Sequence, residues 1–180
     1  MEDGGNAGVA DPQDFVGAIV ERWREIRPDL DSTPMLVAAR IIRLAVLLDN
    51  ELRPPFAAAG LATGDFDLLA ALRRQGPPHE ASPGQLAAAM LVTTGAATKR
   101  VDRLEAQGYV SRRISNADRR GRVVGLTKAG LKLTDDLYGV HLANEARILQ
   151  PLTPTERDQL ARLLATLGAS MEQDAGVVTP

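Results

Sequence analysis

The chain has 180 residues, a formal net charge of −2 and 44% hydrophobic residues, which suits one domain or one domain with an added dimerisation layer. It has no cysteine and only two histidines, His79 and His141, which are far apart in the sequence. This composition excludes disulfides and thiolate metal sites and argues against a zinc site or a Ser-His-Asp constellation. We therefore expect no cofactor, no metal and no enzyme activity.

No membrane or secretion signal is predicted. The N-terminal stretch 1–14 is acidic and glycine-rich and lacks the basic and apolar regions of a signal peptide. The longest apolar stretch, residues 35–48, contains Arg40 and Arg43, so it is not expected to span a membrane. We expect a cytoplasmic protein without a membrane partner, and disordered tails at residues 1–10 and 175–180.

The first predicted helix begins near Asp11, an N-cap residue that is followed by Pro12 at the first helical position. It should end before Pro28. Residues at spacings of four, four and three give it an apolar stripe, formed by Phe15, Ile19, Trp23 and Ile26.

The second predicted helix runs from Met35 to about Ala59 and completes an N-terminal region of residues 11–59. It is apolar on nearly all sides, so we expect that a second subunit buries part of it. Pro54 and Pro55 predict a kink or an early end.

The region 60–126 is predicted to contain three helices and a hairpin. After a break at Gly60, Thr63 caps a helix whose apolar residues are Phe66, Leu68, Leu69, Ala71 and Leu72. A capping box at residues 82–85 opens a short helix that ends near Met90, and the next helix, residues 94–107, ends at Gly108. Strands are predicted at residues 109–114 and 122–126. Two helices joined by a tight turn and followed by a hairpin form a winged helix-turn-helix.

Basic residues concentrate between Thr93 and Leu126. This stretch holds eight basic and three acidic residues, although the whole chain has a net charge of −2. Such a basic island is typical of a surface that meets phosphates. The alternative for the stretch is a solvated charged face. For single residues, Arg103 could instead pair with Asp102 or Glu105, and one of the strand arginines Arg112 and Arg113 could face solvent.

The C-terminal region, residues 127–174, is predicted to be two helices. Thr127 caps the first, which can run to about Leu149, and a second capping box at residues 153–156 opens the other. The last helix carries a leucine stripe formed by Leu160, Leu163, Leu164 and Leu167.

Residues 34–174 resemble the MarR family of bacterial regulators. The most specific part is Asp118-Arg119-Arg120 followed by Leu126-Thr127 and Gly130, which matches the wing signature of that family. The resemblance implies a mainly α fold with a small β-hairpin wing, in which a winged helix-turn-helix is joined to a helical dimerisation layer. It also implies a homodimer that binds a palindromic operator in double-stranded DNA, most simply as a repressor.

The residues expected to meet DNA lie at two helix starts and on the wing. Short polar residues at the start of a recognition helix can reach base edges, peptide N–H groups there can hold phosphate, and wing arginines can enter the minor groove. The candidates are Ser82, Gln85, Thr93, Thr94, Thr98, Lys99, Arg103, Arg112, Arg119, Arg120 and Arg122. Asp118 is expected to brace the wing by pairing with Arg120 or Arg122.

The added N-terminal helix resembles the urate-responsive branch of the family. The positions that match the ligand residues of that branch are Trp23, Arg27, Asp67 and Arg100. The resemblance implies a small anionic effector such as urate, with Trp23 stacking on a planar ring and the arginines meeting an anionic oxygen. Arg100 lies on the recognition helix and is expected to point inward, so it would join the effector to DNA binding.

Two alternatives to this site remain. The same residues would also suit another anion, such as aconitate, citrate or a different purine, or Asp67 and Arg100 could simply form a buried ion pair. For the whole protein, the alternative is a winged-helix adaptor that binds a protein and not DNA.

Overall fold

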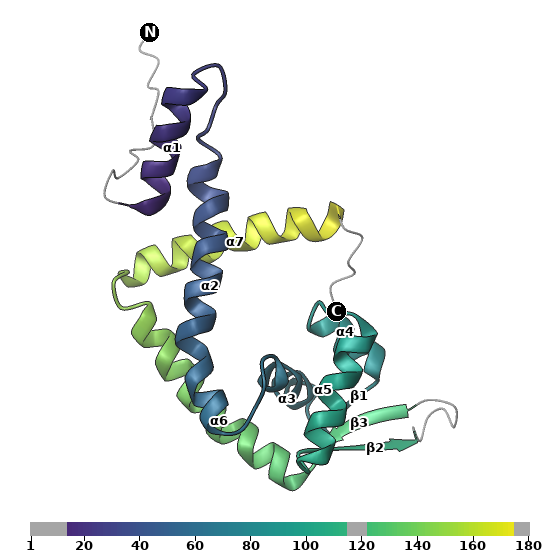
Figure 1. Ribbon diagram of the computed structural model, residues 1–180. Coiled ribbons are helices and arrows are strands. Elements are labelled where there is room, and N and C mark those ends of the chain that lie inside the picture. The colour runs from purple at the N-terminus through teal and green to yellow at the C-terminus, as the bar shows by residue number, and fades with distance from the viewer. Residues whose placement is uncertain (1–13, 115–121, 175–180) are drawn as a thin grey trace. The chain divides into compact units, whose positions relative to one another are not determined.

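The computed structural model describes residues 14–114 and 122–174 (Figure 1). These residues form a mainly helical chain with a small antiparallel sheet, which confirms the predicted fold class. The chain divides into two compact units, residues 1–54 and 55–180. Within the described ranges, no helix is long and apolar enough to cross a membrane.

The N-terminal unit contains α1 (Phe15–Ile26) and most of α2 (Met35–Ala58). The N-cap of α1 is Asp14, whose carboxylate accepts a hydrogen bond from the Val16 N–H at 3.2 Å, so the helix begins later than Asp11 and Pro12 predicted. Arg40 of α2 donates to the same carboxylate at 2.5 Å. Asp14 thus caps one helix and ties it to the next.

The buried face of α1 differs from the predicted stripe. Val16, Gly17 and Val20 are buried, whereas Phe15 and Trp23 are 58% and 46% exposed. The guanidinium of Arg43 lies over the Phe15 ring, with its Cζ 4.3 Å from the ring centroid. Apolar spacing predicted the helix correctly but not the face it buries, because spacing shows which residues share one side of a helix and not which side is covered in the fold.

The helix α2 continues through Pro54 and Pro55, so the predicted early end is wrong. Each proline lacks one backbone N–H donor. A tertiary contact stabilises the last turn of α2, because Phe56 stacks on Phe66 of α3 with ring centroids 4.3 Å apart. The helix then ends as predicted at Gly60, which has a φ of 75°.

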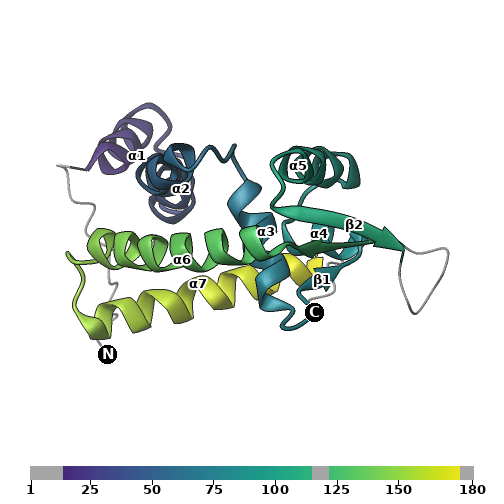
Figure 2. The same ribbon diagram turned by 90° about the horizontal axis from the view of Figure 1, so that it is seen from below.

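The C-terminal unit is built around α3 (Asp65–Arg74), with α4 (Pro83–Ala89) and α5 (Thr94–Ala106) packed against it (Figure 2). Its antiparallel sheet is formed by β1 (Glu80–Ala81), β2 (Val110–Ile114) and β3 (Arg122–Leu126). The strand order in the sheet is β1-β3-β2. The two-residue strand β1 was not predicted, because it is too short to show alternation. The predicted apolar residues of α3 and α5 are buried and form the core, which includes Phe66, Leu68, Leu69, Leu72, Ala97, Val101 and Leu104.

The start of α3 depends on a glycine. Its N-cap is Gly64 with a φ of 79°, and not the predicted Thr63. The side-chain cap is replaced by Asp65, which accepts a hydrogen bond from the Ala62 N–H at 2.9 Å. The chain therefore turns into α3 through a left-handed residue, which glycine adopts without strain.

The Leu-Thr-x-x-Gly part of the wing signature forms a packed junction. The Thr127 hydroxyl accepts from the Gly130 N–H at 3.0 Å and donates to the Gly108 carbonyl at 2.7 Å. A Cβ at Gly130 would lie 1.9 Å from the Tyr109 carbonyl oxygen, so only glycine fits there. These residues fix the start of α6 (Lys128–Ile148) against the end of α5 and the start of β2.

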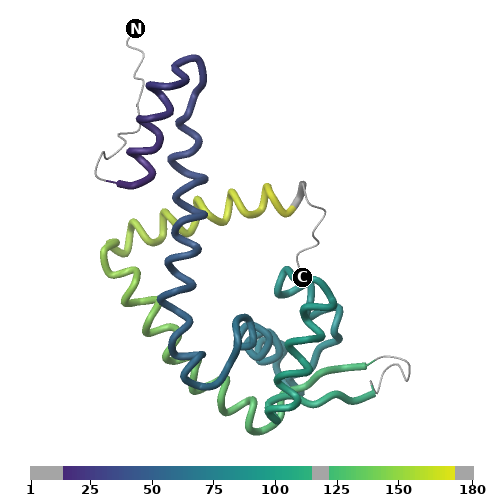
Figure 3. The backbone as a smooth tube through the Cα atoms, in the orientation of Figure 1, coloured from purple at the N-terminus to yellow at the C-terminus, as the bar shows by residue number. Residues whose placement is uncertain are grey.

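The last helix, α7 (Pro154–Asp174), follows α6 after a short turn (Figure 3). The predicted capping box is present, because Glu156 accepts from the Thr153 N–H and Thr153 accepts from the Glu156 N–H. Large apolar side chains on α7 remain exposed in the single chain, and so do several on α2. They include Leu160, Leu163, Leu164, Leu167 and Met171 on α7, and Val37, Ile42, Leu44 and Val46 on α2.

Candidate nucleic-acid interface

The start of α5 presents short polar side chains and one lysine. Thr93 is the N-cap, with its hydroxyl accepting from the Ala96 N–H at 3.2 Å, and the Thr98 hydroxyl donates to the Thr94 carbonyl at 2.9 Å. Thr94, Thr98 and Lys99 are exposed, and Lys99 forms no ion pair with any residue that the structure describes. A helix start of this kind can meet phosphate through its N–H groups and base edges through its side chains.

The start of α4 carries the predicted capping box. The Ser82 hydroxyl accepts from the Gln85 N–H at 3.2 Å, and the Gln85 side-chain oxygen accepts from the Ser82 N–H at 2.8 Å. Both side chains therefore stabilise the helix start. Gln85 is exposed and keeps its amide NH₂ group as a possible donor to phosphate.

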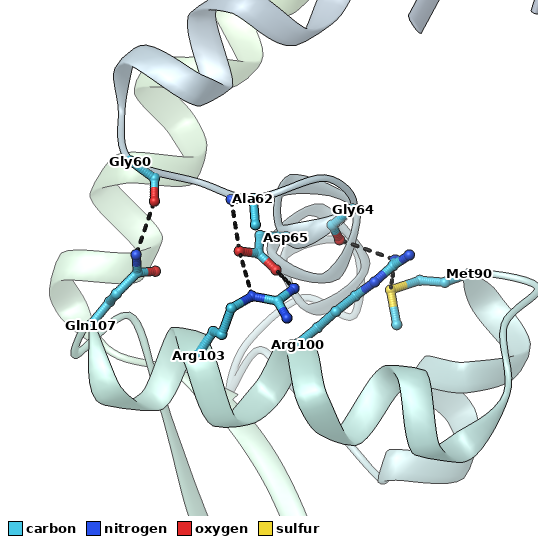
Figure 4. A network of polar contacts seen from close by, with 8 residues as sticks. All are labelled: Gly60, Ala62, Gly64, Asp65, Met90, Arg100, Arg103 and Gln107. Carbon is cyan, nitrogen blue, oxygen red and sulfur yellow. Dashed lines mark hydrogen bonds and ion pairs between the residues drawn. The ribbon is translucent and has the colours of Figure 1, made fainter. Parts of the chain in front are cut away.

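Two arginines of α5 turn toward α3 (Figure 4). The Arg103 guanidinium binds the buried carboxylate of Asp65, with Nη2 and Oδ1 2.6 Å apart, and this contact raises the pKa of Arg103. Arg100 donates to the Gly64 carbonyl at 3.2 Å and contacts the Met90 sulfur. The predicted inward direction of Arg100 is confirmed, whereas the proposed pairing of Arg103 with Asp102 or Glu105 is wrong.

Asp65 is a residue that the sequence reasoning missed. It is fully buried, which is unusual for an acid and requires partners for its charge. The available signal was an acid at the first helical position directly after a glycine. That signal alone is not specific, because an acidic residue in the first turn of a helix is common and is explained by its favourable interaction with the helix dipole.

The strand arginines are held by carboxylates. Arg112 of β2 pairs with both Asp102 and Glu105 of α5, and Arg113 pairs with Glu80 of β1, at 2.6 Å between Nε and Oε1. Arg112 is half-buried and Arg113 is exposed, and the exposed Arg113 is nevertheless held by its pair with Glu80. These pairs cross from helix to strand and from strand to strand, and they stabilise the hairpin base. Arg122 is exposed at the start of β3.

The wing tip lies outside the described residues. Asp118, Arg119 and Arg120 belong to this segment, so their predicted roles in bracing and in minor-groove contact stay predictions.

The candidate effector residues divide between the two units. Trp23 and Arg27 line a hollow of about 190 Å³ in the N-terminal unit, together with residues from Leu30 to Met35. Arg27 pairs with Asp29 at 2.7 Å. In the C-terminal unit, Asp67 is exposed on the first turn of α3 and does not pair with Arg100, so the alternative of a buried ion pair is wrong. The joint site of the four residues stays a prediction.

Comparison with known proteins places the chain among transcriptional regulators. The model of the MarR family matches residues 59–121. The chain is similar to the HTH-type transcriptional regulator PecS of Dickeya dadantii, with 39% identity over 149 residues that cover 83% of this chain and 90% of PecS. The uncharacterized HTH-type transcriptional regulator YkoM of Bacillus subtilis is 31% identical over 61% of this chain and 69% of its own.

Solved structures share the fold. AbsC, a MarR family transcriptional regulator from Streptomyces coelicolor, superposes with a TM-score of 0.72 at 22% identity, over 80% of this chain and 97% of AbsC. A second regulator of that organism, Sco3205 in complex with DNA, gives 0.70 at 24% identity, over 78% of this chain and 89% of its own. The expectation that the chain is not an enzyme is confirmed by this family. The chain therefore belongs to the MarR family of DNA-binding transcriptional regulators.

Proposed function

We propose that the protein is a homodimeric repressor that binds a palindromic operator and is released from it by a small anionic effector such as urate. The observation that carries the DNA-binding part is the exposed start of α5, where Thr94, Thr98 and Lys99 stand at the N-terminal end of a helix that is held firmly on its other sides. We assign base and phosphate contacts to these three residues, and further phosphate contacts to Gln85, Arg122 and the wing arginines Arg119 and Arg120.

The homodimer is supported by the apolar surface that the single chain leaves open. No residue of α2 is buried in the described chain, although two thirds of its positions are apolar, and α7 exposes its leucine stripe. Exposed apolar surface on this scale marks an association site. A two-fold dimer would present two recognition helices to two half-sites of a palindrome.

The effector is supported by the hollow beside Trp23 and Arg27. An exposed indole face and a guanidinium are the groups that suit a planar anion. Asp67 and Arg100 complete the set that the resemblance to the urate-responsive branch implies. Release requires only that the effector binds the free form of the protein more tightly than the DNA-bound form.

A binding experiment tests the regulator. The full-length protein is titrated onto a duplex from the region directly upstream of its own coding sequence and onto a scrambled duplex, over a series of salt concentrations. We expect preference for the upstream duplex and a steep fall of affinity with salt, because phosphate contacts release counterions. Equal affinity for both duplexes would contradict a specific repressor, and absence of binding at low salt would favour the protein-binding adaptor.

The effector is tested separately, by thermal shift with urate, xanthine, aconitate and citrate. A ligand of the native protein raises its apparent stability by mass action. We expect urate to raise the melting temperature and to release the duplex, and we expect Trp23→Ala and Arg100→Ala to blunt both effects. A full response in both variants would place the effector site elsewhere, and a response to aconitate or citrate alone would replace urate with a carboxylate.

A further inference from the structure

We propose that Asp65 is a positioning residue for DNA binding, which holds the recognition helix α5 in register through the ion pair between its buried carboxylate and Arg103. This inference rests on the proposed function and goes beyond it, because it removes Arg103 from the residues that touch DNA and gives it a partner within the protein.

The Asp65 carboxylate has both of its oxygens occupied. Oδ1 accepts from Nη2 of Arg103 at 2.6 Å, and Oδ2 accepts from the Ala62 N–H at 2.9 Å. Asp65 is 0% exposed, so its charge has little access to water. A buried charge that loses its partner is strongly destabilising. Breaking the contact with Arg103 would therefore cost free energy, which favours the paired state.

The ion pair belongs to a larger contact between α5 and the loop 60–65 (Figure 4). Gln107 donates to the Gly60 carbonyl at 2.9 Å, and Arg100 donates to the Gly64 carbonyl at 3.2 Å. Arg100, Arg103 and Gln107 follow each other at spacings of three and four, so they lie along one side of the helix. Three side chains, spaced over two helical turns, thus hydrogen-bond to one short loop.

This side of α5 is not the side that carries the threonines. At 100° per residue, Thr94 and Thr98 lie about half a turn around the helix from the three residues that hydrogen-bond to the loop. A rotation or slide of α5 would have to break the Asp65 contact, and it would also change where the threonines stand. The ion pair therefore sets how the helix start is presented.

The two roles of Arg103 predict opposite signs for one substitution. Asp65→Asn removes a negative charge and frees the Arg103 guanidinium. If Arg103 contacts DNA, this change leaves affinity unchanged or increases it. If Arg103 positions the helix, the same change weakens binding, because the restraint on α5 is lost while the electrostatics improve.

The experiment measures affinity for the upstream duplex over a salt series, with the full-length protein and its variants Asp65→Asn, Arg103→Gln and the double variant. We expect Asp65→Asn to weaken binding about tenfold, as the loss of a charged hydrogen bond suggests. The salt slope should stay that of the wild type, because no phosphate contact is lost. The affinity of the double variant should be no lower than that of the single variant with the lower affinity, because both substitutions break the same contact.

Asp136→Asn is the matched control, since it removes the same charge from an exposed position on α6, where Asp136 pairs with Lys132. It should bind like the wild type. Circular dichroism fixes a temperature at which each variant is folded. If either single variant does not fold, the double variant carries the test, because it removes both charges of the pair, including the buried charge of Asp65.

Affinity of Asp65→Asn equal to or above that of the wild type would overturn the positioning role. So would a salt slope reduced by about one in the double variant, the mark of a lost phosphate contact. A wild-type protein that shows no preference for the upstream duplex would overturn the proposed function itself, which the other outcomes leave standing.

Discussion

The guanidinium of Arg100 occupies the space that a side chain at Gly64 would need. An ideal Cβ at Gly64 would lie 2.2 Å from the Cζ atom of Arg100, and Gly64 also has a φ of 79°. The glycine is therefore required twice, once by its backbone and once by its neighbour. Gly60 in the same loop has a φ of 75° but open space around its Cα, so it shares only the first requirement.

We predict that Gly64→Ala lowers the free energy of unfolding more than Gly60→Ala does. The left-handed backbone costs a non-glycine residue about 1–2 kcal/mol at either position. Gly64→Ala must in addition displace Arg100 and break its hydrogen bond to the Gly64 carbonyl. Urea unfolding of both variants measures the difference. In an Arg100→Ala background the excess should vanish, and its persistence there would contradict the explanation.

Lys99 is expected to contribute one phosphate contact. Lys99→Ala should weaken binding to the upstream duplex and reduce the salt slope by about one, because one fewer counterion is released. Lys132→Ala is the matched control, since Lys132 is an exposed lysine of α6 that pairs with Asp136. Equal slopes for both variants would show that Lys99 does not meet the DNA backbone.

The leucine stripe of α7 is expected to lie in the dimer interface. Leu164→Glu should shift the protein toward monomer, because it places a charge in an apolar contact. Ala165→Glu adds the same charge at the next position, about 100° around the helix and away from the stripe, and should leave the dimer intact. Light scattering coupled to size-exclusion chromatography measures both masses. A dimer of unchanged stability in Leu164→Glu would exclude this stripe from the interface.

The contact between Asp14 and Arg40 should make the attachment of α1 depend on pH. The hydrogen bond from Arg40, followed by that from the Val16 N–H, lowers the pKa of Asp14 below its ordinary value of 3.8. A lowered carboxyl pKa stabilises the fold above the ordinary value, and this contribution is lost as the pH falls through the lowered pKa.

Asp14→Asn removes the charge but keeps a good N-cap. Its α1 should therefore be less stable than that of the wild type at pH 6, and the difference should shrink as the pH falls below 3.8. Fluorescence of Trp23, the only tryptophan and a residue of α1, reports the order of this helix. Glu25→Gln, on the exposed surface of α1, serves as the control. A difference that is constant with pH would show that the ion pair does not stabilise α1.

The sequence by itself determined the order of the elements and most of their ends. The capping boxes at Ser82 and Thr153, the break at Gly60 and the cap at Gly108 are interactions between residues within a few positions of each other, so local sequence is sufficient to specify them. The signature that contains Thr127 and Gly130 could also be recognised from the sequence, and it indicated the MarR family. The concentration of basic residues between Thr93 and Leu126 required only counting.

Only the tertiary structure decided what each of those basic residues does. Arg103 meets Asp65 across 38 positions of sequence, and Arg113 meets Glu80 across 33, through a strand too short to predict. Which face of α1 is buried was decided in the same way, by packing against α2. Charge pairs and buried faces depend on which distant segments come together, and this is set by close packing of the whole unit, which local periodicity does not contain.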